Sequence, residues 1–93
     1  MDQVLRQMNE MEERYWRVIG HCVRERRRAL HWSQADLAAR TGLSRGEIQH
    51  IESHRRNPRV GTLKRLCKAF GISYMEFVAQ TERVEQEWLR AAR

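Results

Sequence analysis

Two helix starts lie close together in the middle of the chain, with a glycine between them. Ser33 is followed three residues later by Asp36, and Ser44 is followed three residues later by Glu47. A serine that caps the first turn, with an acidic residue at the third helical position, is typical of a helix N-terminus. Gly42 can adopt the left-handed conformation that commonly ends a helix. Segment 33–53 therefore predicts two short helices joined by a tight turn.

Helical patterns also cover the rest of the chain, which contains a single proline. Residues 2–31 predict one long helix or two abutting helices, because their apolar residues recur alternately every four and three positions. A fourth helix is expected from about Val60 to Phe70, closed by Gly71, and a fifth from Ser73 onwards. The sequence thus predicts an all-α protein.

The positive charge is concentrated in the middle of the chain. The formal net charge is +6, and residues 15–72 carry thirteen Lys or Arg against four acidic residues. Residues 1–14 and 73–93 are slightly acidic. A basic centre favours a polyanionic partner, although a solvated surface would also account for it.

The two cysteines predict buried, reduced thiols. Cys22 and Cys67 each lie in an apolar helical pattern, and no Cys or His spacing typical of a metal site is present. We therefore expect no metal and no cofactor. The sequence also shows no signal peptide and no apolar run long enough to span a membrane, so we expect no membrane association.

The segment from Trp32 to Glu52 resembles the Cro and phage-repressor (XRE) family of helix-turn-helix DNA-binding proteins. Its Ser-Gln-x-x-Leu-Ala, Thr-Gly-Leu-Ser and Ile-x-x-Ile-Glu segments have the family's spacing, and the resemblance covers about residues 17–78. It implies a five-helix, lambda-repressor-like DNA-binding domain, here residues 15–79, with helical extensions at 1–14 and 80–93. The third helix of such a domain lies in the major groove.

The resemblance also implies roles for individual residues. Arg45 can form a bidentate pair with guanine and Gln49 with adenine, which are the usual side-chain pairings in the major groove. In relatives, an acid at the position of Glu52 pairs with a basic residue at that of Arg27, so this pair is interpreted as structural. The expected base-reading residues are Arg45, Gly46, Gln49 and His50, and the expected phosphate-binding residues are Gln34, Ser44, Arg55, Arg56 and Arg59.

Both ends of the chain carry apolar stripes that must be buried somewhere. The two stripes can pack together within one chain or across a two-fold axis. A dimer fits a DNA-binding function better, because it reads two half-sites about 34 Å apart. The residues expected in the dimer interface are Val4, Met8, Met11, Tyr15, Phe77, Val84 and Trp88.

These observations predict a cytoplasmic, nucleoid-associated transcriptional regulator that represses as a homodimer on double-stranded DNA. Two alternatives stay open. One is an antitoxin that also binds a toxin and regulates its own operon, and the other is a protein-interaction module on the same scaffold. No sequence motif indicates an enzyme.

Overall fold

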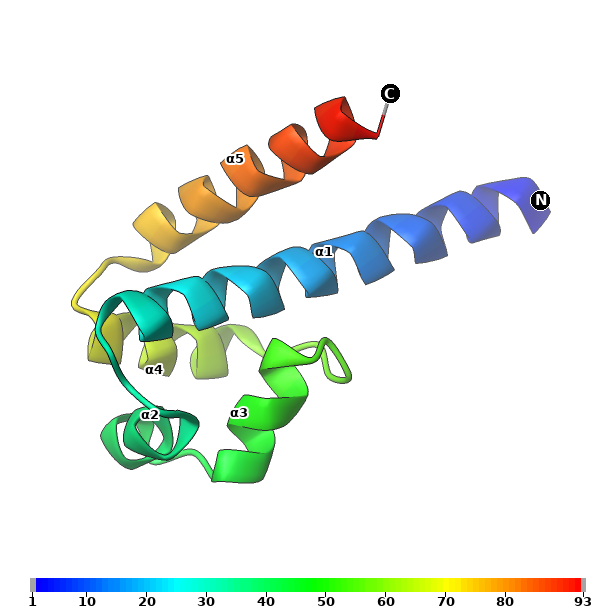
Figure 1. The fold of residues 1–93 in the computed structure, drawn as a ribbon. Coiled ribbons are helices and arrows are strands. Elements are labelled where there is room, and N and C mark those ends of the chain that lie inside the picture. The colour runs from blue at the N-terminus through cyan, green and yellow to red at the C-terminus, as the bar shows by residue number, and fades with distance from the viewer. Residues whose placement is uncertain (1, 93) are drawn as a thin grey trace.

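The structure, a computed structural model, describes residues 2–92. This part of the chain forms five α-helices (Figure 1). The all-α, five-helix prediction is confirmed, and the first helix is continuous through Gly20 rather than divided in two. The helices are α1 (Asp2–Ala29), α2 (Gln34–Thr41), α3 (Arg45–Glu52), α4 (Val60–Phe70) and α5 (Tyr74–Ala91).

Each predicted pair of a serine and an acidic residue forms a capping box, in which the two residues bond each other's backbone N–H. The two capping boxes determine where α2 and α3 begin. The Asp36 backbone N–H donates to the Ser33 hydroxyl at 3.0 Å, and the Ser33 N–H donates to the Asp36 carboxylate at 2.8 Å. The bond from the Ser33 N–H is the main reason why the pKa of Asp36 lies below its ordinary value. Ser44 and Glu47 form the same reciprocal pair at the start of α3. Gly42, with φ of 75°, ends α2 in the left-handed conformation.

The core lies between the second half of α1 and the other four helices. Both cysteines belong to it as free thiols, and burial raises the pKa of Cys22 to about 11. Cys22 therefore stays protonated and unreactive near neutral pH. The buried apolar residues are Val18, Ile19, Cys22, Val23, Leu37, Leu43, Ile48, Ile51, Leu63, Leu66, Cys67 and Phe77.

Helix α5 packs on α1 of the same chain, which corrects one of the interface predictions. Phe77 was expected between two copies, but only 1 % of it is exposed, because it fills the core of its own chain. Tyr15, Val84 and Trp88 are half-buried against the same core. The apolar stripe of α5 is therefore largely buried within one chain.

The N-terminal part of α1 extends beyond the rest of the molecule (Figure 1). We call residues 2–13 the arm. Every residue of the arm is exposed, including the large apolar side chains of Val4, Leu5, Met8 and Met11. The arm continues the helix of the core without a break, so its direction is set by the core.

Helix α3 meets α1 at a close approach that only a glycine allows. A Cβ atom at Gly20 would lie 2.5 Å from the carbonyl oxygen of Ile51 and 3.0 Å from that of Glu52. Both atoms belong to the backbone at the end of α3, so they cannot move aside as a flexible side chain would. The missing side chain at Gly20 thus sets the distance between the two helices.

Replacing Gly20 with alanine should therefore lower the free energy of unfolding by about 2 kcal/mol, because the helices must separate to admit the methyl group. Gly61, in α4, is the matched control, since a Cβ there would meet nothing within 4 Å. Gly61→Ala should raise stability by about 0.5–1 kcal/mol through helix propensity. Urea denaturation of both variants checks the signs, and a stable Gly20→Ala protein would contradict the close approach.

Candidate nucleic-acid interface

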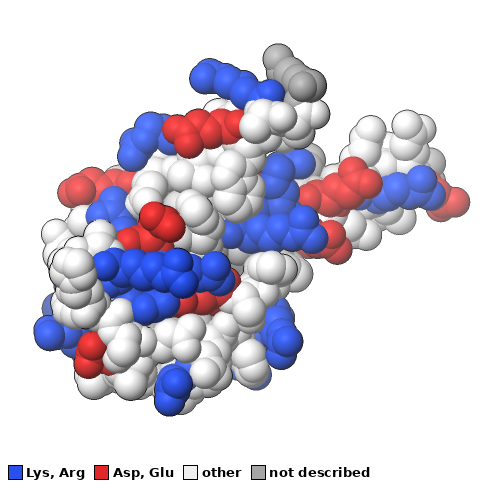
Figure 2. All heavy atoms as spheres, in the orientation of Figure 1, with Lys and Arg blue, Asp and Glu red and all other residues white. Residues whose placement is uncertain are grey.

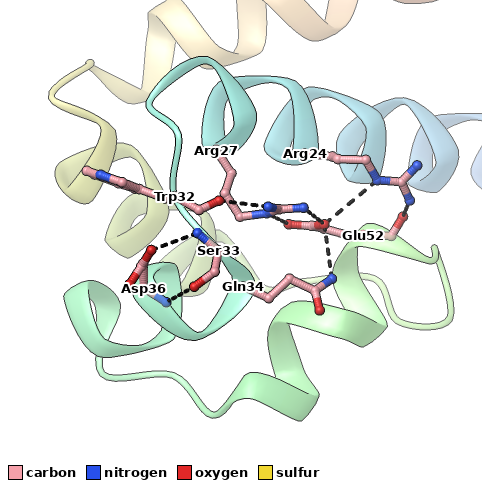
Figure 3. A network of polar contacts seen from close by, with 7 residues as sticks. All are labelled: Arg24, Arg27, Trp32, Ser33, Gln34, Asp36 and Glu52. Carbon is pink, nitrogen blue, oxygen red and sulfur yellow. Dashed lines mark hydrogen bonds and ion pairs between the residues drawn. The ribbon is translucent and has the colours of Figure 1, made fainter.

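The last residue of α3 is held by a buried ion pair (Figure 3). Glu52 is 3 % exposed, and its carboxylate accepts hydrogen bonds from Nε and Nη2 of Arg27 at 2.7 and 2.9 Å. These bonds raise the pKa of Arg27 above its ordinary value. Nη1 of Arg27 donates to the backbone oxygen of Trp32 at 2.8 Å. The ion pair therefore joins α3 to α1 and to the turn that precedes α2.

Two further side chains complete this network around Glu52. Nη2 of Arg24 donates to the Glu52 backbone oxygen at 2.8 Å, and its Nε lies 3.7 Å from the carboxylate. The side-chain amide of Gln34 donates to Oε1 of Glu52 at 3.2 Å (Figure 3). Sequence reasoning did not include Arg24. The available signal was its position three residues before Arg27, which puts both on one face of α1.

One face of α3 presents its side chains outward. Arg45 and Gln49 are exposed, while Gly46 and His50 are half-buried. Within residues 2–92, no ion pair involves Arg45. The four residues expected to read bases therefore lie on the accessible side of α3, with Arg45 and Gln49 the most prominent.

Four of the expected contact residues share one open hollow of about 380 Å³. Gln34 comes from the first turn of α2, Gln49 and His50 from α3, and Arg55 from the loop after it. The Gln34 amide has two N–H donors, of which Glu52 uses one. The other remains for a ligand.

The remaining expected phosphate-binding residues lie outside that hollow. Arg56 and Arg59 line a second open hollow of about 360 Å³, together with Glu47 of α3. Ser44 lines neither hollow; it is exposed, and its oxygen accepts the capping hydrogen bond of Glu47. The expected phosphate contacts are therefore spread along both sides of α3 rather than gathered at one point.

Charge is distributed unevenly over the molecule. Figure 2 shows many Lys and Arg side chains, with acidic ones among them, on the visible face of the globular part, and both acidic and basic side chains on the projecting arm. The arm contains four acidic residues and one arginine. The globular part that carries α3 is thus the part suited to a polyanion.

Two other kinds of site are absent from the described range. Residues 2–92 hold no group of three or more His, Cys, Asp and Glu side chains that could bind a metal ion. No helix in this range combines the length and the apolar character needed to cross a membrane.

Comparison with known proteins places this geometry in context. A family model described as helix-turn-helix matches residues 23–77. The chain is 35% identical over 66 residues to an uncharacterized HTH-type transcriptional regulator, y4dJ, of Sinorhizobium fredii, covering 71% of this chain and 86% of that protein.

Two solved structures share the fold. A restriction-modification controller protein superposes with a TM-score of 0.69 at 23% identity, covering 74% of this chain and 88% of that chain. The clp gene regulator ClgR from Corynebacterium glutamicum superposes with a TM-score of 0.74 at 22% identity, covering 84% and 81%.

Replacing Glu52 with glutamine should lower the free energy of unfolding by about 3 kcal/mol, because it leaves the buried Arg27 charge uncompensated. Glu85, which pairs with Arg14 at 3.2 Å in a more exposed setting, is the control. Glu85→Gln should cost less than about 1 kcal/mol. Chemical denaturation measures both, and equal losses would show that the Glu52 network does not hold α3.

Proposed function

The chain belongs to the helix-turn-helix family of transcriptional regulators, and we propose that it represses transcription by binding a two-half-site DNA operator as a homodimer. The observation that carries the proposal is the outward face of α3. Arg45 and Gln49 are exposed on it, and Glu52 anchors the other end of the same helix in the core. A rigid helix with free polar side chains at its first turns suits the major groove.

Arg45 and Gln49 carry the base recognition in this proposal. The guanidinium of Arg45 pairs with O6 and N7 of guanine, and the amide of Gln49 pairs with N6 and N7 of adenine. Gly46 has no side chain, so it lets the backbone of α3 come close to the bases. His50 follows Gln49 in the chain, lines the same hollow and contributes a further base contact.

Phosphate contacts on both sides of α3 would set its depth and register in the groove. Arg55 with the free N–H of Gln34 serves one side, and Arg56 with Arg59 serves the other. Ser44 adds its hydroxyl at the start of the helix, where backbone N–H groups also favour an anion. These contacts contribute affinity with little sequence information.

Dimerisation follows from the small size of one recognition helix. A single α3 spans few base pairs, whereas two copies read half-sites one helical turn apart. Residues 15–79 form the DNA-binding domain in this proposal, and 1–14 and 80–93 extend it. Repression would result from occupying the operator and excluding other proteins from it.

Replacing Arg45 with alanine should weaken binding to the preferred sequence by about 10- to 100-fold, since a bidentate base pair is lost. The preferred sequence is obtained by selecting bound duplexes from a random pool, and affinities are measured by fluorescence anisotropy. Random duplex should be bound almost as well as before. Arg83→Ala, on the exposed side of α5, is the control and should change neither affinity. An equal loss on both duplexes would remove base reading from Arg45.

The affinity for duplex DNA should fall by ~10³-fold between 50 and 200 mM salt, because each neutralised phosphate releases counterions. Arg59→Ala should make the dependence of log Kd on log salt less steep by about one per copy. The same anisotropy titrations at four salt concentrations measure the slope. Binding that does not respond to salt would contradict the phosphate contacts.

A further inference from the structure

Arg24, in the second half of α1, reaches α3 with only part of its guanidinium group. Its Nη2 donates to the backbone oxygen of Glu52 at 2.8 Å, and this is the one hydrogen bond that the Arg24 side chain makes within residues 2–92. A guanidinium has five N–H donors, two of them on each terminal nitrogen. Figure 3 shows the other terminal nitrogen of Arg24 pointing away from Glu52. The two donors on that nitrogen are therefore available to a ligand.

The positive charge of Arg24 is not needed to neutralise Glu52. That carboxylate already has a bidentate partner in Arg27, at 2.7 and 2.9 Å, whereas Nε of Arg24 lies 3.7 Å from it. The side chain of Glu52 is 2 % exposed, but that of Arg24 is 39 % exposed. A second cation beside a compensated ion pair leaves net positive charge at the surface. Arg24 therefore offers an anion both charge and N–H donors.

Arg24 lines the open hollow of about 380 Å³ beside α3, together with Gln34 and Arg55. The three side chains come from α1, from α2 and from the loop after α3. Gln34 has a free amide N–H and is the first residue of α2, where backbone N–H groups also favour an anion. Among the described residues that line the hollow, Glu52 alone is acidic, and Arg27 compensates it. The hollow thus combines two cations with a neutral donor.

We propose that Arg24, Gln34 and Arg55 bind one and the same DNA phosphate. The proposal rests on the proposed function, because it takes duplex DNA as the partner. It adds Arg24 to the phosphate-binding residues, and it assigns three contacts to a single group of the DNA backbone. The guanidinium of Arg24 also bonds the last residue of α3. The phosphate is therefore held at a fixed distance from the helix that reads the bases.

The shape and the chemistry of the hollow fit a phosphate within a nucleic-acid strand. Phosphate oxygens accept several hydrogen bonds at once, and the planar fork of an arginine matches their geometry. Gln49 and His50 line the same hollow, so a strand that passes through it stays next to the bases that α3 contacts. Because the hollow is open, the strand can continue beyond it on both sides.

The first test changes single phosphates of the duplex. Each phosphate of one half-site in the selected preferred sequence is replaced in turn by an uncharged methylphosphonate. At the shared phosphate, wild-type affinity in fluorescence anisotropy should fall roughly tenfold, because charge-assisted hydrogen bonds are lost. Arg24→Gln, Gln34→Ala and Arg55→Gln should each bind the unmodified duplex more weakly. At that one position they should show little further loss, since groups that interact give non-additive effects.

Arg26→Gln is the matched control for Arg24→Gln. Arg26 lies on the same helix, is also half-buried and donates from Nε to the side chain of Gln80 at 2.6 Å, but it does not line the hollow. Both substitutions remove one positive charge, so a general electrostatic loss affects them alike. Arg26→Gln should keep the full wild-type loss at every modified phosphate. Circular dichroism and urea denaturation check that all variants remain folded.

A second variant separates binding of the phosphate from the support that Arg24 gives to α3. Arg24→Lys keeps the positive charge but lacks the fork that bonds the Glu52 backbone and a phosphate together. It should keep the wild-type dependence of log Kd on log salt, whereas Arg24→Gln should make that dependence less steep by about one per copy. If both variants kept the wild-type slope, Arg24 would only support α3, and the proposal would be overturned.

The outcomes distinguish this site from the proposed function. If Arg24→Gln keeps the full wild-type loss at every modified phosphate, the contact by Arg24 is overturned. If the three variants lose their sensitivity at different phosphates, the shared site is overturned, while base reading by Arg45 stands. A wild-type protein that binds no duplex overturns the proposed function and this site together.

Discussion

The position of α3 depends on one buried carboxylate. Glu52 receives hydrogen bonds from Arg27 and Gln34, and its backbone oxygen receives one from Arg24. A buried charge is tolerated only when its partners are in place, so the network around Glu52 allows little variation in the position of α3. Because the last residue of α3 is fixed to α1 and Ile48 packs in the core, the opposite face of α3, with Arg45 and Gln49, points outward.

Gly20 and the two capping boxes give this anchor its effect. The glycine lets the end of α3 come into backbone contact with α1. At the opposite end, Ser44 and Glu47 bond the free backbone N–H groups of the first turn of α3. The exposed side chains of Arg45 and Gln49 are therefore not needed to cap the helix. The helix is thus constrained at both ends, and its outward side chains are available for a ligand.

The apolar face of α1 is continuous, but it is buried along one part of the helix and exposed along another. Where α5 runs beside it, the face belongs to the core, and Phe77 and Thr81 are buried there. Over the arm the same face is exposed to solvent. The globular part carries most of the positive charge, and the arm carries acidic residues beside its exposed apolar side chains.

The amino-acid sequence by itself determined the secondary structure and the ends of the helices. Caps such as Ser33 with Asp36, and the glycine at 42, act between residues a few positions apart. Their effect can therefore be predicted from the amino-acid sequence alone. The partnership of Arg27 with Glu52 came from family resemblance. Tertiary structure decided the rest. It buries Phe77 within its own chain, brings Arg24 and Gln34 to Glu52, and puts the end of α3 in close contact with Gly20. A stripe predicts that a face must be covered but not by what, because the covering surface is set by contacts between residues far apart in the chain.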